Sequence, residues 1–358
     1  MLFQPRQDYL GIDISDLSLR IVQFRRTLTG ALTLAGMSSC DLAPEIFAEG
    51  ELKDANGFVT ALKQMIAKPQ VGRFTTAYTV ACLPETKTFI KVIDIPPMPL
   101  DEIPQAIKWE AEHHIPIPID DTYWDWQQVG TPSKSNARLP ILLGVSPKAI
   151  VDSYDDALRR ASLVPVAMEI EAVAIARSLL PLDPPDNASA TMIIDLGATR
   201  TSLIVFDHQT IQFTASLPIS GRHVTQQIAA TLSITEEQAE KAKLVCGLDP
   251  KKCHGAMREI LHGTMDALVR SINEATIFYH EHFPQGHEFG EVLLCGGGAN
   301  FKYIDEYMGE RLKLKVERGN PWRNLGTEPP PMKPGDLLPY TTSIGLALRT
   351  LNGRNNHD

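Results

Sequence analysis

The sequence lacks the features that would mark a membrane, secreted or nucleic-acid-binding protein. It has no apolar run of about 18 residues, the length that a membrane-spanning helix requires, so we expect membrane contact only through a partner. It begins without the apolar stretch of a signal peptide, which favours a cytoplasmic protein. The 34 Lys and Arg residues are outnumbered by 43 Asp and Glu, so we expect no nucleic-acid partner.

Cysteine is also scarce, with five residues in 358 and no CxxC pair. Their scattered placement and odd number fit free, buried thiols in a reducing compartment. No histidine pair lies at ligand spacing near two of them, so the cysteines predict no zinc site. They are Cys40, Cys82, Cys246, Cys253 and Cys295.

The chain contains an internal repeat, and its length suggests about two domains. Residues 10–24 and 192–206 share one pattern, in which an apolar strand ends near an aspartate and a short polar turn leads into a second apolar strand. Further strands are expected at 31–37 and 211–217. The short turns predict antiparallel hairpins.

Helices alternate with buried strands along the rest of the chain, which predicts an α/β protein of two similar lobes with a cleft between them. The expected helices cover residues 54–67, 105–112, 148–162, 236–244, 256–282 and 341–351. The expected isolated strands cover residues 76–83, 141–145 and 292–295.

Residues 82–145 interrupt the first copy and read as a small α/β unit of their own. Its three tryptophans, Trp109, Trp124 and Trp126, are expected in the core of that unit. The proline-rich segment 326–339 is expected to be a surface loop, because proline disfavours helix and strand interiors. The tail 352–358 is expected to fray.

The repeated turns carry the chemistry. A carboxylate in an apolar strand needs backbone donors or a bound cation, and Asp13 and Asp195 hold this place in the two copies. Small residues in the turns let an anion approach the backbone N–H groups. Two facing turns could hold a polyphosphate, with Mg²⁺ bound to both aspartates through water. The alternative is that each aspartate only shapes its own turn.

A third feature lies at Gly296, Gly297 and Gly298, where a predicted strand runs into three glycines and then a helix. The backbone there can lie flat against a ligand. The segment is not a P-loop, since no GK[ST] sequence follows.

These segments together resemble the actin, Hsp70 and sugar-kinase superfamily, and more narrowly the PilM family of type IV pilus assembly, relatives of FtsA. The resemblance covers about residues 9–351. It rests on GIDISDLSLR, KVIDIPPMPLDEIPQAIKWEAEHHIPIPIDD, DLGATRTSLIVF, EEQAEKAKLVCGL and LLCGGGANF.

The resemblance implies an actin-like (ribonuclease H-like) duplicated α/β fold with an interlobe nucleotide cleft and an FtsA/PilM-type inserted subdomain. The implied division is a first lobe of residues 1–84 and 136–185, an insert of 85–135, a second lobe of 186–351, and the tail.

The same resemblance assigns residues to ATP and Mg²⁺. Asp13 and Asp195 would be catalytic and hold Mg²⁺ through water, and Glu171 would orient the attacking water. The nucleotide-binding residues would be Ser15, Ser18, Arg20, Gly197, Ala198, Thr199, Thr201, Glu240, Lys243, Gly296, Gly297 and Gly298.

Two residues depart from the family pattern. Ser15 stands where members commonly have glycine, and a non-glycine residue must avoid positive φ there or accept strain. Arg20 replaces the lysine expected to contact the β-phosphate; it keeps the charge but not the shape. We therefore expect slow turnover. Glu240 and Lys243 could alternatively form an ordinary surface pair three residues apart.

The implied function is a cytoplasmic nucleotide-binding protein of a pilus, secretion or DNA-uptake platform, peripheral to the inner membrane. Its implied partners are the N-terminal cytoplasmic peptide of a PilN-like inner-membrane protein, held by the insert, and other platform proteins, with self-association also possible. The alternative is a non-hydrolysing scaffold of a secretion system, as in GspL. A small-molecule kinase is disfavoured, because no aspartate has the context of a catalytic base.

Overall fold

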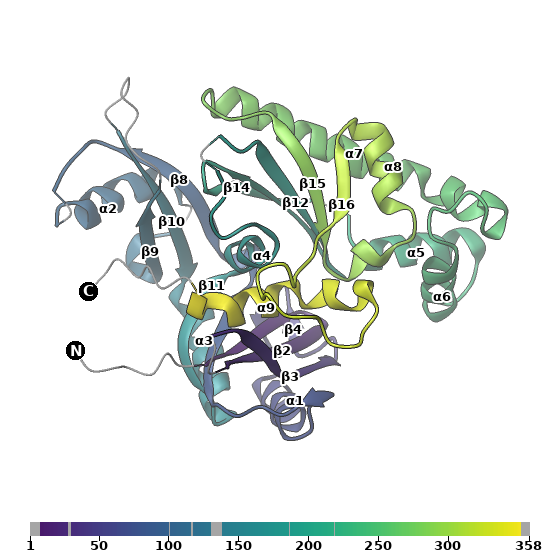
Figure 1. Ribbon diagram of the computed structural model, residues 1–358, viewed down its shortest axis with the longest axis horizontal. Helices are drawn as coiled ribbons and strands as arrows, with labels where there is room; N and C mark the ends of the chain where they lie inside the picture. The colour runs from purple at the N-terminus through teal and green to yellow at the C-terminus, as the bar shows by residue number, and fades with distance from the viewer. Residues whose placement is uncertain are drawn as a thin grey trace.

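The computed structural model builds the chain around two mixed sheets with one repeated design (Figure 1). It describes residues 8–27, 30–99, 101–115, 117–129, 138–185, 187–217 and 219–351. The expected frayed tail, residues 352–358, lies outside the described residues.

The first sheet combines an antiparallel meander with two parallel strands, β7 and β11, on one side. Its order is β11-β7-β1-β2-β3-β6. The strands are β1 (Leu10–Ser15), β2 (Ser18–Arg26), β3 (Leu32–Asp41), β6 (Val71–Gly72), β7 (Tyr78–Leu83) and β11 (Val164–Ile170). A separate two-stranded ribbon pairs β4 (Phe47–Ala48) with β5 (Glu51–Leu52).

The second sheet repeats that design in the order β16-β15-β12-β13-β14 and then continues into β8-β10-β9. The repeated strands are β12 (Ala190–Leu196), β13 (Thr201–Asp207), β14 (Thr210–Leu217), β15 (Phe289–Cys295) and β16 (Lys315–Arg318). The added strands are β8 (Phe89–Ile95), β9 (Thr122–Gln128) and β10 (Leu139–Pro147).

The insert is therefore joined to the second sheet, through the pairing of Lys91 in β8 with Phe213 in β14. It keeps a hydrophobic cluster of its own, which includes Ile93, Ile107 and Ile141. No pattern in the sequence indicated this edge pairing, because strand partners more than 100 residues apart leave no local signal. The domain boundaries given above stay a prediction.

Helices cover the sheets, and most lie within a few residues of their predicted positions. They are α1 (Ala55–Ala67), α2 (Ile103–His114), α3 (Lys148–Arg160), α4 (Glu171–Leu179), α5 (Gly221–Leu232), α6 (Glu236–Cys246), α7 (Ala256–His282), α8 (Ile304–Leu312) and α9 (Thr341–Ala347). The final predicted helix is shorter than expected, because a 3₁₀ turn, Leu348–Leu351, follows α9.

Helices α4 and α9 cross between the two sheets (Figure 1). Helix α4 packs on the second sheet through a cluster that includes Ile175 and Ile193, while α9 packs on β1 of the first. The crossing is close because Gly345 has no side chain; a Cβ there would lie 1.8 Å from the carbonyl oxygen of Ala174. This crossing fixes the two sheets beside one another.

The segment 326–339 is only partly the predicted surface loop. A 3₁₀ helix, Pro334–Tyr340, occupies its second half. Leu337 and Tyr340 are buried in a cluster with Phe24 and Trp322. The high proline content predicted a loop, but Leu337 and Tyr340 pack this segment against the first sheet.

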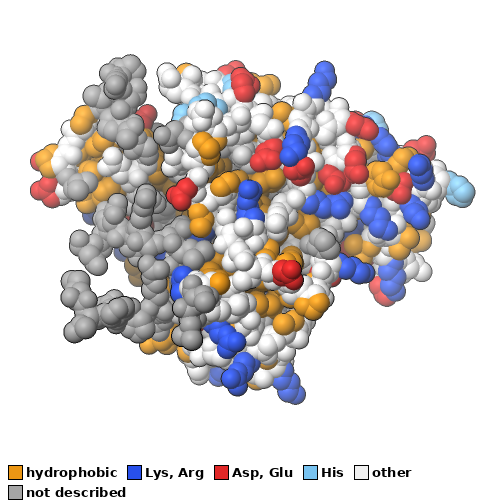
Figure 2. All heavy atoms as spheres, in the orientation of Figure 1, with side chains coloured by type: hydrophobic (Ala, Val, Ile, Leu, Met, Phe, Trp, Pro, Cys, Tyr) orange, Lys and Arg blue, Asp and Glu red, His pale blue; other side chains and the backbone are white. Residues whose placement is uncertain are grey.

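Trp109 also differs from expectation. Its side chain on α2 is 65% exposed, so it is not a core residue, whereas Trp124 and Trp126 pack against the cluster of the insert. In the described ranges, no helix is both long and apolar enough to cross a membrane. On the face drawn in Figure 2, basic and acidic side chains intermix over the second-sheet helices.

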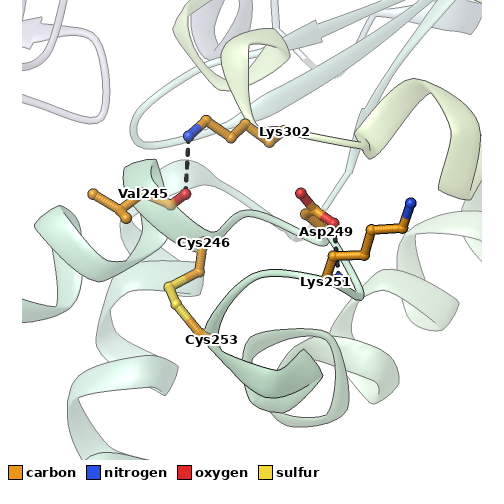
Figure 3. Close-up of a disulfide and its surroundings, with 6 residues drawn as sticks. All are labelled: Val245, Cys246, Asp249, Lys251, Cys253 and Lys302. Carbon is orange, nitrogen blue, oxygen red and sulfur yellow. Dashed lines mark hydrogen bonds between the residues drawn. A yellow bond between two sulfur atoms is a disulfide. The ribbon is translucent and has the colours of Figure 1, made fainter.

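The cysteine prediction is wrong for one pair. Cys246, at the end of α6, forms a disulfide with Cys253, whose Cα lies 5.8 Å away (Figure 3). The chain turns back after α6 through Gly247, with φ at 58°, and the Nζ of Lys302 donates to the carbonyl of Val245 at 2.9 Å. Cys40, Cys82 and Cys295 are free thiols, and the last two are buried as expected.

Candidate functional site

A cavity of about 630 Å³ lies where the two repeated hairpins face each other. We call it the central cavity. It brings together nearly all the residues that the sequence assigned to a ligand. These are Asp13, Ser15, Ser18, Arg20, Glu171, Asp195, Gly197, Ala198, Thr199, Glu240, Lys243, Gly296, Gly297 and Gly298.

Thr201 is the one assigned residue that does not line the cavity. It begins β13 with 1% of its surface exposed, and its buried hydroxyl has no hydrogen-bond partner. Its backbone pairs with Leu196 across the hairpin. Thr201 is therefore part of the second hairpin but does not line the central cavity.

The first turn joins β1 to β2 and places Asp13 against Arg20, its register partner. The Arg20 guanidinium lies 3.5 Å from a carboxylate oxygen of Asp13 and donates to the Ser18 hydroxyl at 2.8 Å. The hydroxyls of Ser15 and Ser18 are 2.7 Å apart. Ser15 lies at the end of β1 and does not take a positive φ, so the missing glycine causes no backbone strain.

The second turn joins β12 to β13 and leaves Ala198 and Thr199 exposed to the cavity. Gly197 donates its N–H to the carbonyl of Arg200 at 2.8 Å, which closes the turn. The carbonyls of Gly197 and Ala198 accept from the first two residues of α5, Gly221 and Arg222. The turn is thus held in place by the start of a helix.

The two aspartates have equivalent partners. The Cys82 thiol, in β7, donates to Asp13 at 3.6 Å, and the Cys295 thiol, in β15, donates to Asp195 at 3.7 Å. Both cysteines lie on the parallel strand beside the aspartate's own strand. The duplication therefore extends to a thiol–carboxylate pair that strand pairing creates and that sequence reasoning missed.

Acidic groups dominate the cavity. Burial raises the pKa of Asp13, although the nearby Arg20 opposes the shift. Burial, reinforced by the charges of Asp195 and Asp13, raises the pKa of Glu171 well above its usual range. Burial, then the charges of Asp13 and Glu85, raises the pKa of Asp195 to about 7. Carboxylates crowded in this way fit a divalent cation, which would relieve their repulsion.

Glu85 is a cavity residue that the sequence analysis did not single out. It follows β7 and reaches across the cavity, where it accepts a hydrogen bond from Ser202 in β13. Burial raises its pKa. A signal for it existed, because the carboxyl ends of parallel strands meet at one sheet edge and β7 is parallel to β1.

Glu240 and Lys243 form the i,i+3 ion pair that was the alternative prediction, at 2.7 Å, yet both also line the cavity. The Lys243 ammonium also donates to the carbonyl of Gly221 at 3.2 Å and to the hydroxyl of Thr225 at 2.9 Å. These contacts tie α6 to α5 and fix both side chains at the wall.

The glycine segment packs against the second turn. Gly296 has φ at 76°, and a Cβ there would lie 2.2 Å from a carboxylate oxygen of Asp195. Glu171, at the start of α4, accepts a hydrogen bond from Thr342 of α9 at 3.5 Å. The two crossing helices are thus linked through the Glu171 carboxylate, which lines the central cavity.

Known proteins match this chain over most of its length. A family model described as type IV pilus assembly protein PilM matches residues 11–351. The cell-division protein FtsA of Borreliella burgdorferi is 22% identical over 199 residues, and that of Pseudomonas aeruginosa is 23% identical over 219 residues. These alignments cover 50% and 55% of this chain and 47% and 50% of the relatives, so the chain spans about half the length of the curated relatives it matches.

Solved structures confirm the expected α/β actin-like fold. A PilM–PilN type IV pilus biogenesis complex matches with a TM-score of 0.80 at 22% identity, covering 97% of this chain and 99% of that chain. MreB5 of Spiroplasma citri bound to ADP matches with a TM-score of 0.53 at 12% identity, covering 98% and 100%. At these identities the likeness establishes the fold.

Proposed function

The chain belongs to the PilM family of type IV pilus assembly proteins, and from that premise we propose that it binds ATP with Mg²⁺ in the central cavity and holds a PilN-like membrane protein. One observation carries the nucleotide part. Two equivalent turns, each with a half-buried or buried aspartate, face a shared cavity that also contains Glu85 and Glu171. These carboxylates require a compensating positive charge in the cavity.

The phosphate side of the proposed site is formed by the two turns. Their small residues leave backbone N–H groups open to anionic oxygens, and Arg20 supplies a cationic side chain beside Asp13. Asp13 and Asp195 would hold Mg²⁺ through water. When bound, Mg²⁺ neutralises charge that develops on the transferred phosphoryl group.

The adenosine side is formed by α6 and the glycine segment. Glu240 and Lys243 present polar groups for the ribose and base, and Gly296 to Gly298 allow a flat ring to approach the backbone. Both elements pack in the hydrophobic cluster of the second sheet, whereas Arg20 lies in β2 of the first sheet. A nucleotide would therefore bridge the two sheets.

Glu171 is the residue proposed to orient the attacking water, because it lines the cavity with both aspartates, their charges act on its pKa, and its carboxylate accepts a hydrogen bond from Thr342. A carboxylate must be ionised to accept from water. Positive charge entering the cavity lowers the pKa of Glu171 and favours that state. Turnover is proposed to be slow, so that the bound nucleotide sets the relative position of the sheets.

The PilN part rests on the family and on the insert. The matching PilM structure is a complex with PilN, and the insert of this chain exposes Trp109 (65%) and Tyr123 (48%). Exposed aromatic residues are common anchors at interfaces. We place the N-terminal cytoplasmic peptide of a PilN-like protein on this surface, which would locate the chain in the cytoplasm at the inner membrane.

A second candidate function is a non-hydrolysing scaffold of the GspL type. The observation that favours it is the ion pair between Arg20 and Asp13, which already supplies Asp13 with a cation. In that case the cavity would be held together by its own charges and would not depend on a ligand.

Calorimetric titration with ATP separates the two functions. We expect Mg²⁺-dependent binding that Asp13→Ala and Asp195→Ala each weaken at least about tenfold. Asp156→Ala, which removes an exposed carboxylate on α3, is the control and should change nothing. Absence of binding at millimolar ATP, or binding indifferent to both cavity variants, would favour the scaffold.

Turnover and partner capture are tested separately. Glu171→Ala should retain ATP affinity but lose turnover, and unchanged turnover would remove Glu171 from the mechanism.

Trp109→Ala should weaken binding of a synthetic N-terminal peptide of a PilN-like protein at least about tenfold. Val245→Ala, at a similarly exposed apolar residue on α6 (59%), should not. Equal effects would move the peptide site off the insert.

A further inference from the structure

Outside the central cavity, a second cluster of chemically active side chains lies at the far end of β13. Asp207 ends that strand, and His208 follows it in the turn to β14. His287 comes from the segment between α7 and β15. The end of β13, the turn that follows it and the segment before β15 thus meet at one point.

The carboxylate of Asp207 is held rigidly. It is buried, and one oxygen accepts from the Nδ1 of His287 at 2.8 Å and from the backbone N–H of His208 at 2.7 Å. The other oxygen accepts from the backbone N–H of His287 at 2.8 Å and from the hydroxyl of Tyr279. Its position is therefore fixed by four donors before any ligand arrives.

The two imidazoles lie against this carboxylate and against each other. Their ring centroids are 4.6 Å apart, and the Nε2 of His208 lies 3.5 Å from an Asp207 oxygen. One ligand atom from each of the three residues lies within 4.8 Å of the others. Bonds of about 2.0–2.1 Å around a tetrahedral ion separate neighbouring ligands by about 3.3 Å. The Nδ1 of His287 lies 2.8 Å from one oxygen of Asp207, and the Nε2 of His208 lies 3.5 Å from the other, so these two separations bracket that value.

We propose that Asp207, His208 and His287 form a binding site for a divalent transition-metal ion of the Zn²⁺ class. A cavity of about 310 Å³ leads to the site and is lined by Asp207, His208 and Glu291. It provides an entry path and room for water to complete the coordination sphere. Binding requires the imidazoles to exchange their hydrogen bonds to Asp207 and to the carbonyl of Gln285 for bonds to the metal.

The ligand set separates this site from the central cavity. Imidazole nitrogen selects zinc-class ions, whereas carboxylate and water oxygens suit Mg²⁺. The metal would join the β13–β14 hairpin to the segment that leads into β15, the strand that ends at Cys295, just before Gly296. Its role is to fasten the second sheet, and it takes no part in phosphoryl chemistry.

The test is a calorimetric titration of metal-free, tag-free protein with Zn²⁺, followed by Co²⁺ absorption spectroscopy. We expect one saturable site at micromolar Zn²⁺, a tetrahedral Co²⁺ spectrum and a rise in melting temperature. His208→Gln and His287→Gln should each weaken Zn²⁺ at least about tenfold, since even outer-shell changes can cost that much. His262→Gln is the control, because His262 lies 3.2 Å from a single carboxylate, Asp266.

Circular dichroism confirms that each glutamine variant remains folded before its affinity is interpreted. The Asp13→Ala and Asp195→Ala variants should bind Zn²⁺ like the unmodified protein, which keeps this proposal independent of the nucleotide site. Lack of saturable Zn²⁺ binding, or equal affinity in the His208→Gln and His262→Gln variants, would overturn it. The cluster would then only brace the hairpin.

Discussion

The two repeated hairpins share a backbone design but differ in how their aspartates are compensated. Asp13 has a guanidinium at 3.5 Å, whereas Asp195 has none in hydrogen-bond range among the contacts of the described residues. The strand beside Asp13 continues from Cys82 into Leu83, whereas the strand beside Asp195 ends at Cys295 and the chain passes into Gly296. In the first hairpin, Asp13 is compensated by an ion pair with Arg20. In the second, Asp195 is packed closely against the backbone of Gly296.

This difference makes the two sides of the duplicated fold chemically unequal. Burial raises the pKa of both aspartates. For Asp195 the charges of Asp13 and Glu85 add to burial and the pKa reaches about 7, whereas at Asp13 the charge of Arg20 is the main opposing effect. The second hairpin therefore has the greater need for a cation, while the first can offer Arg20 to an anion. We expect the two sides to respond unequally to the same substitution.

The largest effect is expected at the glycine segment. Gly296→Ala places a Cβ 2.2 Å from an Asp195 oxygen at a φ of 76°, so it should cost about 2–4 kcal/mol of unfolding free energy. Gly297→Ala is the matched control, because a Cβ there has no neighbour within 4 Å. Denaturant unfolding measures both. Similar losses in the two variants would show that close packing against Asp195 is unimportant.

A smaller effect is expected from neutralising each aspartate in the absence of ligand. The folded-state pKa of Asp195 is about 7 against an ordinary 3.8, so the folded state binds the proton more tightly than the unfolded state. Stability therefore falls as the pH rises from about 4 to about 7 and is level above that. Asp195→Asn should raise the unfolding free energy at pH 8 by about 1–2 kcal/mol, and by less at pH 5.5.

Asp13→Asn is the comparison for that experiment. It removes a group whose pKa burial also raises, but it leaves Arg20 without its carboxylate, so its gain at pH 8 should be less than half as large. Equal gains in the two variants would mean that Arg20 does not distinguish the hairpins. Thermal or denaturant unfolding at pH 5.5 and pH 8 provides the measurement.

The smallest effect is expected at Arg20 itself. Arg20→Gln removes the charge that opposes the rise in the pKa of Asp13, and it should lower the unfolding free energy at pH 8 by about 0.5–1 kcal/mol. Arg20→Lys keeps the charge and should retain most of the stability. An identical pH profile of stability for the glutamine variant and the unmodified protein would show that Arg20 does not compensate Asp13.

Much of the frame was predictable because its signals are local. The alternation of apolar residues and the repeated Asp-turn pattern predicted both hairpins, and helical spacing predicted α7 at its observed limits, Ala256–His282. The central cavity followed from the repeat, since equivalent turns of a duplicated fold can face each other. Trp109 and the second half of the segment 326–339 differ from the prediction, because the exposure of a side chain depends on which surface it meets in the folded chain.

Other features depend on partners that are distant along the chain. Glu85 meets Ser202, Cys82 meets Asp13, and His287 meets Asp207, with separations of 117, 69 and 80 residues. The disulfide between Cys246 and Cys253 spans only seven residues, yet it requires the particular reversal after α6. None of these contacts has a periodicity that a linear sequence would display.

By itself, the amino-acid order determined the duplicated frame, the two aspartates and the family to which the chain belongs, because each depends on residues close together in the chain. Only the folded structure decided which carboxylate has a cation beside it, which thiols pair, and where two histidines and an aspartate converge. The physical reason is that charge pairing and metal coordination act over a few ångströms of space, and chain closure over long loops sets those distances.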